Sequence, residues 1–172
     1  MTTAVAILTV SHVLISLAGI ATGFVMIGKL LRNSRSSGWT AAFLSTTVIT
    51  SLSGFLFPVA HLTPAHVFGV ISLAVLGVAV YAYYQRNLTG NWRVAYVVTA
   101  IFAQYLNFFV LIVQSFLKIP ALRTLAPTQT EPAFAAAQGI AFVVFVAVGV
   151  LALIRFRGQP ATAVKQQSLA AI

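Results

Sequence analysis

The sequence predicts an all-α integral membrane protein, folded as a bundle of five transmembrane helices. Three observations support this prediction: 60% of the 172 residues are hydrophobic, only 6% are charged, and the mean hydropathy is +1.00. Soluble domains have about a quarter charged residues and under half apolar ones. This chain could not cover its surface with polar groups in water, so soluble globular and disordered proteins are both excluded.

Five apolar runs follow one another, with short polar or proline-containing connections. A helix needs about 20 apolar residues to cross a hydrocarbon core about 30 Å thick. The first run ends among basic residues, the second ends near Pro58, and Pro64 suits the first turn of the third helix. The fourth opens at Trp92, and the fifth follows a loop with three prolines. The predicted spans are residues 4–31, 39–60, 64–84, 92–117 and 133–154.

Residues 1–157 should therefore form a single bundle, followed by a polar C-terminal tail over residues 158–172. Basic residues set the orientation, because cytoplasmic loops are enriched in Lys and Arg. Two of the ten, Lys118 and Arg123, lie at one end of the bundle; the other eight lie at the opposite end: Lys29, Arg32, Arg35, Arg86, Arg93, Arg155, Arg157 and Lys165. This positive-inside distribution predicts an outside N-terminus and a cytoplasmic C-terminus, most simply in a bacterial inner (plasma) membrane.

The same distribution explains the net charge of +9. In a soluble protein such a charge would suggest nucleic acid as a partner, but here it anchors helix ends. We therefore expect the lipid bilayer as the partner, with other membrane subunits or self-association as candidate protein contacts, and no nucleic acid.

Each predicted helix has one face that is smaller or more polar, and this face should point inward. In the first span Gly19 and Gly23 form a small-residue pair suited to close helix packing. The most polar face is in the fourth span, where Gln104, Asn107, Gln114 and Lys118 fall within an arc of about 80°. Side chains such as Thr47, Ser51 and Gln138 suit interhelical hydrogen bonds. For Gln104 and Asn107, which are costly to bury near mid-membrane, packing and the lining of a ligand or water site are both open.

All three histidines should lie in the external half of the membrane. His12 is about two turns inside the first span, while His61 and His66 flank the turn between the second and third. Gln114, Lys118 and Glu131 reach the same side. We predict that these residues form a histidine cluster, or at least a polar site, at the outer boundary.

Several interpretations of this cluster are open. The histidines could be amphipathic interfacial residues. His12, His61 and His66 are also candidates for a metal site, and two of the imidazoles could hold haem b. An organic ligand or a quinone head group is the fourth interpretation. The absence of cysteine excludes disulfides and thiolate metal sites.

Enzymatic activity is disfavoured, and no catalytic residue is predicted. Glu131 is the sole acid and lies in a loop beside Pro132, so the spans contain no carboxylate for proton relay or for a hydrolytic triad. An ion pair between Lys118 and Glu131 at the outer surface is the simpler expectation.

One group of residues gives a resemblance that covers roughly residues 50–157. It consists of Ser51, Gly54, Phe55, Pro58, His61-Leu62-Thr63-Pro64-Ala65-His66, Gln104-Tyr105-Leu106-Asn107, Gln114, Lys118-Ile119-Pro120-Ala121-Leu122 and the outer loop 125–132. In these residues the sequence resembles a group of small, uncharacterised bacterial multi-pass membrane proteins of unassigned function. The resemblance implies a bacterial multi-pass protein and implies no chemistry.

The sequence thus predicts a non-catalytic membrane protein, either an accessory subunit of a membrane complex or a small-ligand binder with a polar site at the outer boundary. The alternative is a membrane redox protein that holds haem b, a metal ion or a quinone through the histidine cluster.

Overall fold

The computed structural model describes residues 3–58 and 64–157, and in this part the chain is helical with no strand. Within these residues, five helices have 17 or more residues, and two short helical segments follow α3 and α4. In chain order they are α1 (Thr3–Leu31), α2 (Ser37–Gly54), α3 (Pro64–Val80), the π-helical turn η1 (Tyr81–Gln85), α4 (Asn91–Lys118), α5 (Pro120–Leu125) and α6 (Pro132–Arg155).

In the part of the chain that the structure describes, four helical stretches are long and apolar enough to cross a membrane: Thr3–Leu31, His66–Gln85, Asn91–Lys118 and Pro132–Arg155. Large apolar side chains cover the outside of the molecule. Ile7, Leu14, Ile140 and Val143, for example, are each more than 60% exposed. Such a surface is stable only against lipid or another apolar surface, so the structure is that of a membrane protein.

The predicted second span, residues 39–60, differs most from the structure. Helix α2 ends at Gly54, and Phe55 and Leu56 follow in a turn. Pro58 helps to explain the early end, because a proline disfavours helical geometry in the residue before it. Eight of the 18 residues of α2 are Ser or Thr, so α2 lacks the continuous apolar stretch of the four candidate spans.

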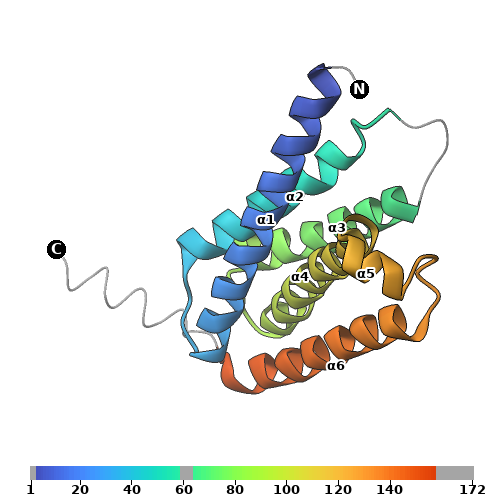
Figure 1. Ribbon diagram of the computed structural model, residues 1–172. Helices are drawn as coiled ribbons and strands as arrows, with labels where there is room; N and C mark the ends of the chain where they lie inside the picture. The colour runs from blue at the N-terminus through green and yellow to red at the C-terminus, as the bar shows by residue number, and fades with distance from the viewer. Residues whose placement is uncertain (1–2, 59–63, 158–172) are drawn as a thin grey trace.

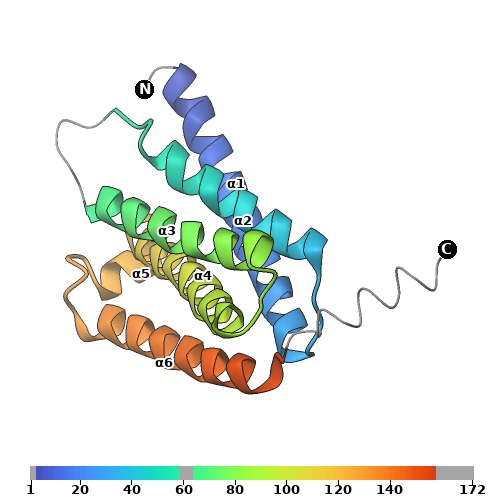
Figure 2. The same ribbon diagram turned by 180° about the vertical axis from the view of Figure 1, so that it is seen from behind.

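Helix α4 lies at the centre of the arrangement and packs against α1, α3, α5 and α6. Figure 1 shows α4 between α3 and α6, with α1 crossing α2 at the side, and the view from behind agrees (Figure 2). The N-terminal half of α1 and the end of α2 project beyond the other helices in both views. Pairing between α1 and α2, and between α2 and α3, completes the bundle.

The hydrophobic core is concentrated near one end of the bundle. It includes Met26 and Leu30 of α1, Phe43 of α2, Tyr96 of α4 and Phe156 after α6, all at most 3% exposed. These residues lie near the end of α1, the start of α2, the start of α4 and the end of α6. The end that is rich in basic residues is therefore the tightly packed end.

Hydrogen bonds between chain segments close this basic end. The Arg93 guanidinium on α4 donates to the carbonyl oxygens of Leu153, at 3.1 Å, and Phe156. These carbonyls belong to the last turn of α6 and the residue after it, where a helix leaves acceptors without partners. The backbone N–H of Arg157 donates to Asn33 Oδ1 at 2.9 Å, which ties the end of α6 to the loop after α1.

Both glycines of the predicted pair in α1 are buried against neighbouring helices, as expected. A Cβ atom on Gly19 would lie 3.3 Å from Thr46 Oγ1 and 3.5 Å from Thr47 Oγ1 of α2. A Cβ atom on Gly23 would lie 2.0 Å from Gln104 Oε1 of α4. The small-residue face of α1 therefore packs directly against both α2 and α4.

Candidate functional site

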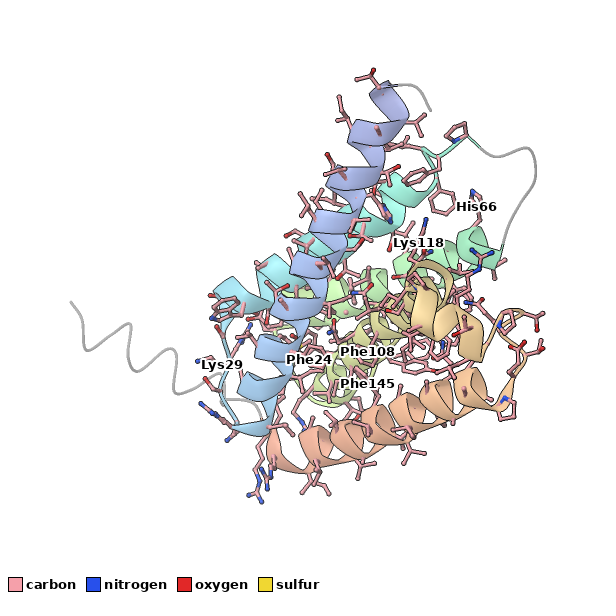
Figure 3. All side chains as sticks on the ribbon, in the orientation of Figure 1. Phe24, Lys29, His66, Phe108, Lys118 and Phe145 are labelled. Atoms are coloured by element: carbon pink, nitrogen blue, oxygen red, sulfur yellow. The ribbon has the colours of Figure 1, made fainter. Side chains whose placement is uncertain are left out.

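The predicted site residues fall into two parts of the structure. Gln104 and Asn107 lie in the middle of the bundle, where α4 meets α1 and α2. His12, His66, Gln114, Lys118 and Glu131 belong to the end opposite the one where most of the basic residues lie. Figure 3 shows this separation, with Lys29 on one side of the molecule and His66 and Lys118 on the other. His61 lies outside the described residues.

The Gln104 side chain connects α4 to the backbone of α1. It is completely buried, and its Nε2 donates to the carbonyl oxygen of Ile20 at 2.9 Å. That carbonyl is in the middle of a continuous helix, so the amide shares an acceptor that the helix already uses. Gln104 Oε1 is buried and has no hydrogen-bond partner within the described residues.

Asn107 makes the corresponding bond to α2. Its Nδ2 donates to Thr47 Oγ1 at 3.1 Å, and Thr47 is completely buried. Two further polar contacts join other helix pairs: Ser51 donates to Ser72 between α2 and α3, and Gln138 Nε2 donates to the Phe109 carbonyl between α6 and α4. Of the two interpretations left open for Gln104 and Asn107, the structure gives the contacts expected for helix packing.

His12 has the most defined environment of the outer residues. Its Nδ1 lies 2.8 Å from Ser53 Oγ at the end of α2, and its ring meets the Phe57 ring edge to face at 5.3 Å between centroids. The Ser53 hydroxyl donates its single proton to the Thr50 carbonyl at 3.0 Å. With that proton on the Thr50 carbonyl, a neutral His12 would donate its Nδ1–H to Ser53 and keep a lone pair on Nε2.

His66 lies in the first turn of α3, against Phe55, which lies in the turn after α2. Its ring centroid is 5.4 Å from that of Phe55. Phe55 also lies against Gly69 one turn later, where a Cβ atom would come within 3.0 Å of its ring. The residues after α2 thus link both described histidines, because Phe55 contacts His66 and Phe57 contacts His12.

Gln114 and Lys118 lie on an exposed face of α4. Neither side chain has a hydrogen bond or ion pair to another described residue. The expected convergence of Gln114 with the histidines in one layer is therefore not seen as a direct contact. At this end of the bundle it is the Gln129 side chain that hydrogen-bonds to α4: its Nε2 donates to the Val113 carbonyl at 2.9 Å.

Glu131 bonds within its own loop and forms no ion pair with Lys118, contrary to expectation. Its Oε1 accepts the backbone N–H of Thr128 at 3.1 Å and the Thr128 hydroxyl at 2.8 Å, and its Oε2 accepts the N–H of Thr130 at 3.0 Å. Slight desolvation raises the pKa of Glu131, but these hydrogen bonds outweigh it and hold the pKa below its usual value. The carboxylate therefore orders the loop before α6.

Among the described residues, no group of three or more His, Cys, Asp or Glu side chains is placed to hold a metal ion. The three-histidine metal candidate includes His61, so it extends beyond the described residues. Comparisons with family models, with curated proteins and with solved structures found no match to this chain.

Ser53 and Phe57 are the site residues that the sequence analysis did not single out. The signal that could have found Ser53 is the antiparallel pairing of the first two helices. His12 lies seven residues before Gly19, on the same face of α1, and this face meets α2.

Substituting Thr128 with Val should raise the pKa of Glu131, because the carboxylate then loses its hydroxyl donor while the backbone donors stay. The stabilisation that Glu131 gives to the loop is present above the unfolded pKa and is lost as the pH falls through the folded pKa. Titration followed by NMR of the Glu131 side-chain carboxyl measures this directly, because no other acidic side chain is present. Thr124→Val, which removes an exposed hydroxyl in α5, should leave the titration unchanged; an unchanged pKa in Thr128→Val would contradict the assignment.

Proposed function

We propose that this chain is a non-catalytic multi-pass membrane protein that binds a small ligand at the outer membrane boundary, alone or as an accessory subunit of a membrane complex. The observation that supports this proposal is the contact of His12 Nδ1 with Ser53 Oγ at 2.8 Å, which favours the tautomer with the proton on Nδ1. Its Nδ1–H is engaged by Ser53, so Nε2 is left as a hydrogen-bond acceptor in apolar surroundings. A ligand with one O–H or N–H donor on an aromatic or aliphatic body matches such a site.

The surroundings of His12 favour a ligand over a purely structural imidazole. The ring is only partly buried, and it lies in the half of the bundle away from the main core. Phe57 provides an aromatic surface beside it. An apolar ligand reaching the site from the membrane would exchange lipid contacts for these rings and gain one hydrogen bond.

We further propose five spans with the N-terminus outside, in a bacterial inner membrane. Helix α2 has 18 residues and is about 27 Å long at 1.5 Å per residue, which approaches the thickness of the hydrocarbon core. Several of its hydroxyls bond the helix's own backbone, as Thr46 does to Ala42 at 2.6 Å, which lowers the cost of placing them in lipid. The seven described basic residues at one end support the orientation.

The alternative function is a redox protein that holds haem b, a metal ion or a quinone. One observation favours it: histidines that ligate metals commonly donate their second ring N–H to a protein acceptor, as His12 Nδ1 does to Ser53. A Soret absorbance band, or a metal present in stoichiometric amount in the detergent-purified protein, would support this alternative over the non-catalytic one.

Hydroquinone, a small apolar ring with two O–H donors, should bind at His12. In ¹⁵N NMR spectra of the purified protein we expect a saturable shift of the His12 Nε2 resonance, whereas 1,4-dimethoxybenzene, which has the same ring and no donor, should give none. His12→Phe keeps the ring packing and should abolish binding, and Ser53→Ala should weaken it by freeing the tautomer. Equal responses to the two compounds, or no response to either, would contradict the proposed site.

The orientation has its own test, because the chain contains no native cysteine. A cysteine at Thr130 should react with a membrane-impermeant thiol reagent in intact cells, whereas a cysteine at Ser36 should react only after the cells are permeabilised. The reverse pattern would place the histidines on the cytoplasmic side. Reaction at both positions in intact cells would contradict the three spans proposed between them, because an odd number of crossings places the two positions on opposite sides.

A further inference from the structure

A small cavity lies at the basic end of the bundle, away from the site of His12. The end of α1, the loop to α2, the start of α2, η1, the start of α4 and the residue after α6 surround it. Its volume is about 10 Å³, and its polar lining includes Lys29, Ser34, Arg35, Ser36 and Tyr83. A space of this size admits a single oxygen atom or one water molecule.

The Tyr83 hydroxyl is the unusual group in this lining. Tyr83 is 3% exposed, and its hydroxyl oxygen is buried with no hydrogen-bond partner within the described residues. Two of the other hydroxyls in the lining, those of Thr40 and Tyr96, bond each other at 3.2 Å. A buried tyrosine hydroxyl normally has a partner, so this group calls for an acceptor that the described residues do not supply.

The charges around the cavity identify that acceptor as an anion. Lys29 and Arg35 both line the cavity, and the Arg35 guanidinium carbon lies 4.8 Å from the centroid of the Tyr83 ring. The only acidic side chain of the whole sequence, Glu131, is at the opposite end of the bundle. The protein therefore has no carboxylate side chain to pair with these cations.

The start of α2 adds further donors at the same place. Ser36 precedes the first residue of α2 and lines the cavity, and its side chain makes no capping hydrogen bond. The first N–H groups of a helix have no partner within the helix and attract anions. Two cations, a free hydroxyl and a helix start thus meet at one small opening.

We propose that this cavity binds a phosphate group. One phosphate oxygen enters the cavity and accepts the Tyr83 hydroxyl proton, while Lys29, Arg35 and the start of α2 hold the other oxygens at the opening. The chemistry is common to the head group of an anionic lipid and to free inorganic phosphate. Basic pockets between transmembrane helices are typical sites for anionic lipid head groups.

The test uses the full-length protein in lipid nanodiscs and in detergent, with phosphatidylglycerol, phosphatidylcholine and inorganic phosphate as separate probes. Native mass spectrometry and the thermal unfolding midpoint report binding. We expect retention of phosphatidylglycerol in preference to phosphatidylcholine, and we expect Tyr83→Phe to weaken it about tenfold, as the loss of one charge-assisted hydrogen bond would. Arg35→Gln should weaken it as well. Saturable stabilisation by inorganic phosphate, equally sensitive to Tyr83→Phe, would show free phosphate as the source.

Two controls separate binding from folding. Tyr84→Phe removes the hydroxyl of the exposed neighbouring tyrosine, and Arg123→Gln removes a cation at the other end of the bundle; both should bind as the unmodified protein does. Without phosphate or anionic lipid, Tyr83→Phe should leave the unfolding midpoint unchanged or raised, because an unpaired buried hydroxyl is lost. A lowered midpoint in that state would indicate a structural water on Tyr83. That result, or a Tyr83→Phe variant that binds every probe normally, would overturn the proposal.

Discussion

The Gln104 side chain crosses from α4 to α1 in the middle of an apolar bundle, and the placement of α1 depends on this contact. The amide fits only because residue 23 of α1 is glycine, since a Cβ atom there would overlap all three terminal atoms of the Gln104 side chain. Hydrophobic burial gives helices little reason to associate inside a membrane, so close packing and hydrogen bonds decide which faces meet. Gly19, seated on Thr46 and Thr47, fixes the same face of α1 against α2.

The packing of Gly19 and Gly23 against α2 and α4 determines where His12 lies. His12 precedes Gly19 by seven residues, about two turns or 10 Å along the same helix face. The buried residues of α1 all come from its second half, so the first half is oriented by Gly19 and Gly23 rather than by a core of its own. The result is an imidazole directed at Ser53, with one ring nitrogen engaged and the other available. The two ends of the bundle thus differ: the basic end is densely packed around Phe43 and Tyr96, while the histidine end is held by a few polar and aromatic contacts.

The long apolar helices and the glycine face of α1 follow from residue type and spacing, and the sequence predicts both. The early end of α2 at Gly54 does not follow in the same way, because the residues after it, Phe55, Leu56 and Phe57, are as apolar as a span would require. The partners of Gln104 and Asn107 also depend on which helices are neighbours, which hydropathy does not report. The environment of Tyr83 is harder still to predict, because its cavity is lined by residues of α1, α2, η1, α4 and the chain after α6, and no local pattern links them.

The central claim is that Gln104 and Gly23 fit each other and thereby hold α1 on α4. A double-mutant cycle on the unfolding free energy in detergent tests it most directly, with Gly28→Ala as the control, since a Cβ atom on Gly28 meets nothing within 4 Å. We predict that Gly23→Ala destabilises the protein by about 1–3 kcal/mol, that Gly28→Ala has little effect, and that the cost of Gly23→Ala largely disappears in the Gln104→Ala background. An equal cost of Gly23→Ala in both backgrounds would contradict the account.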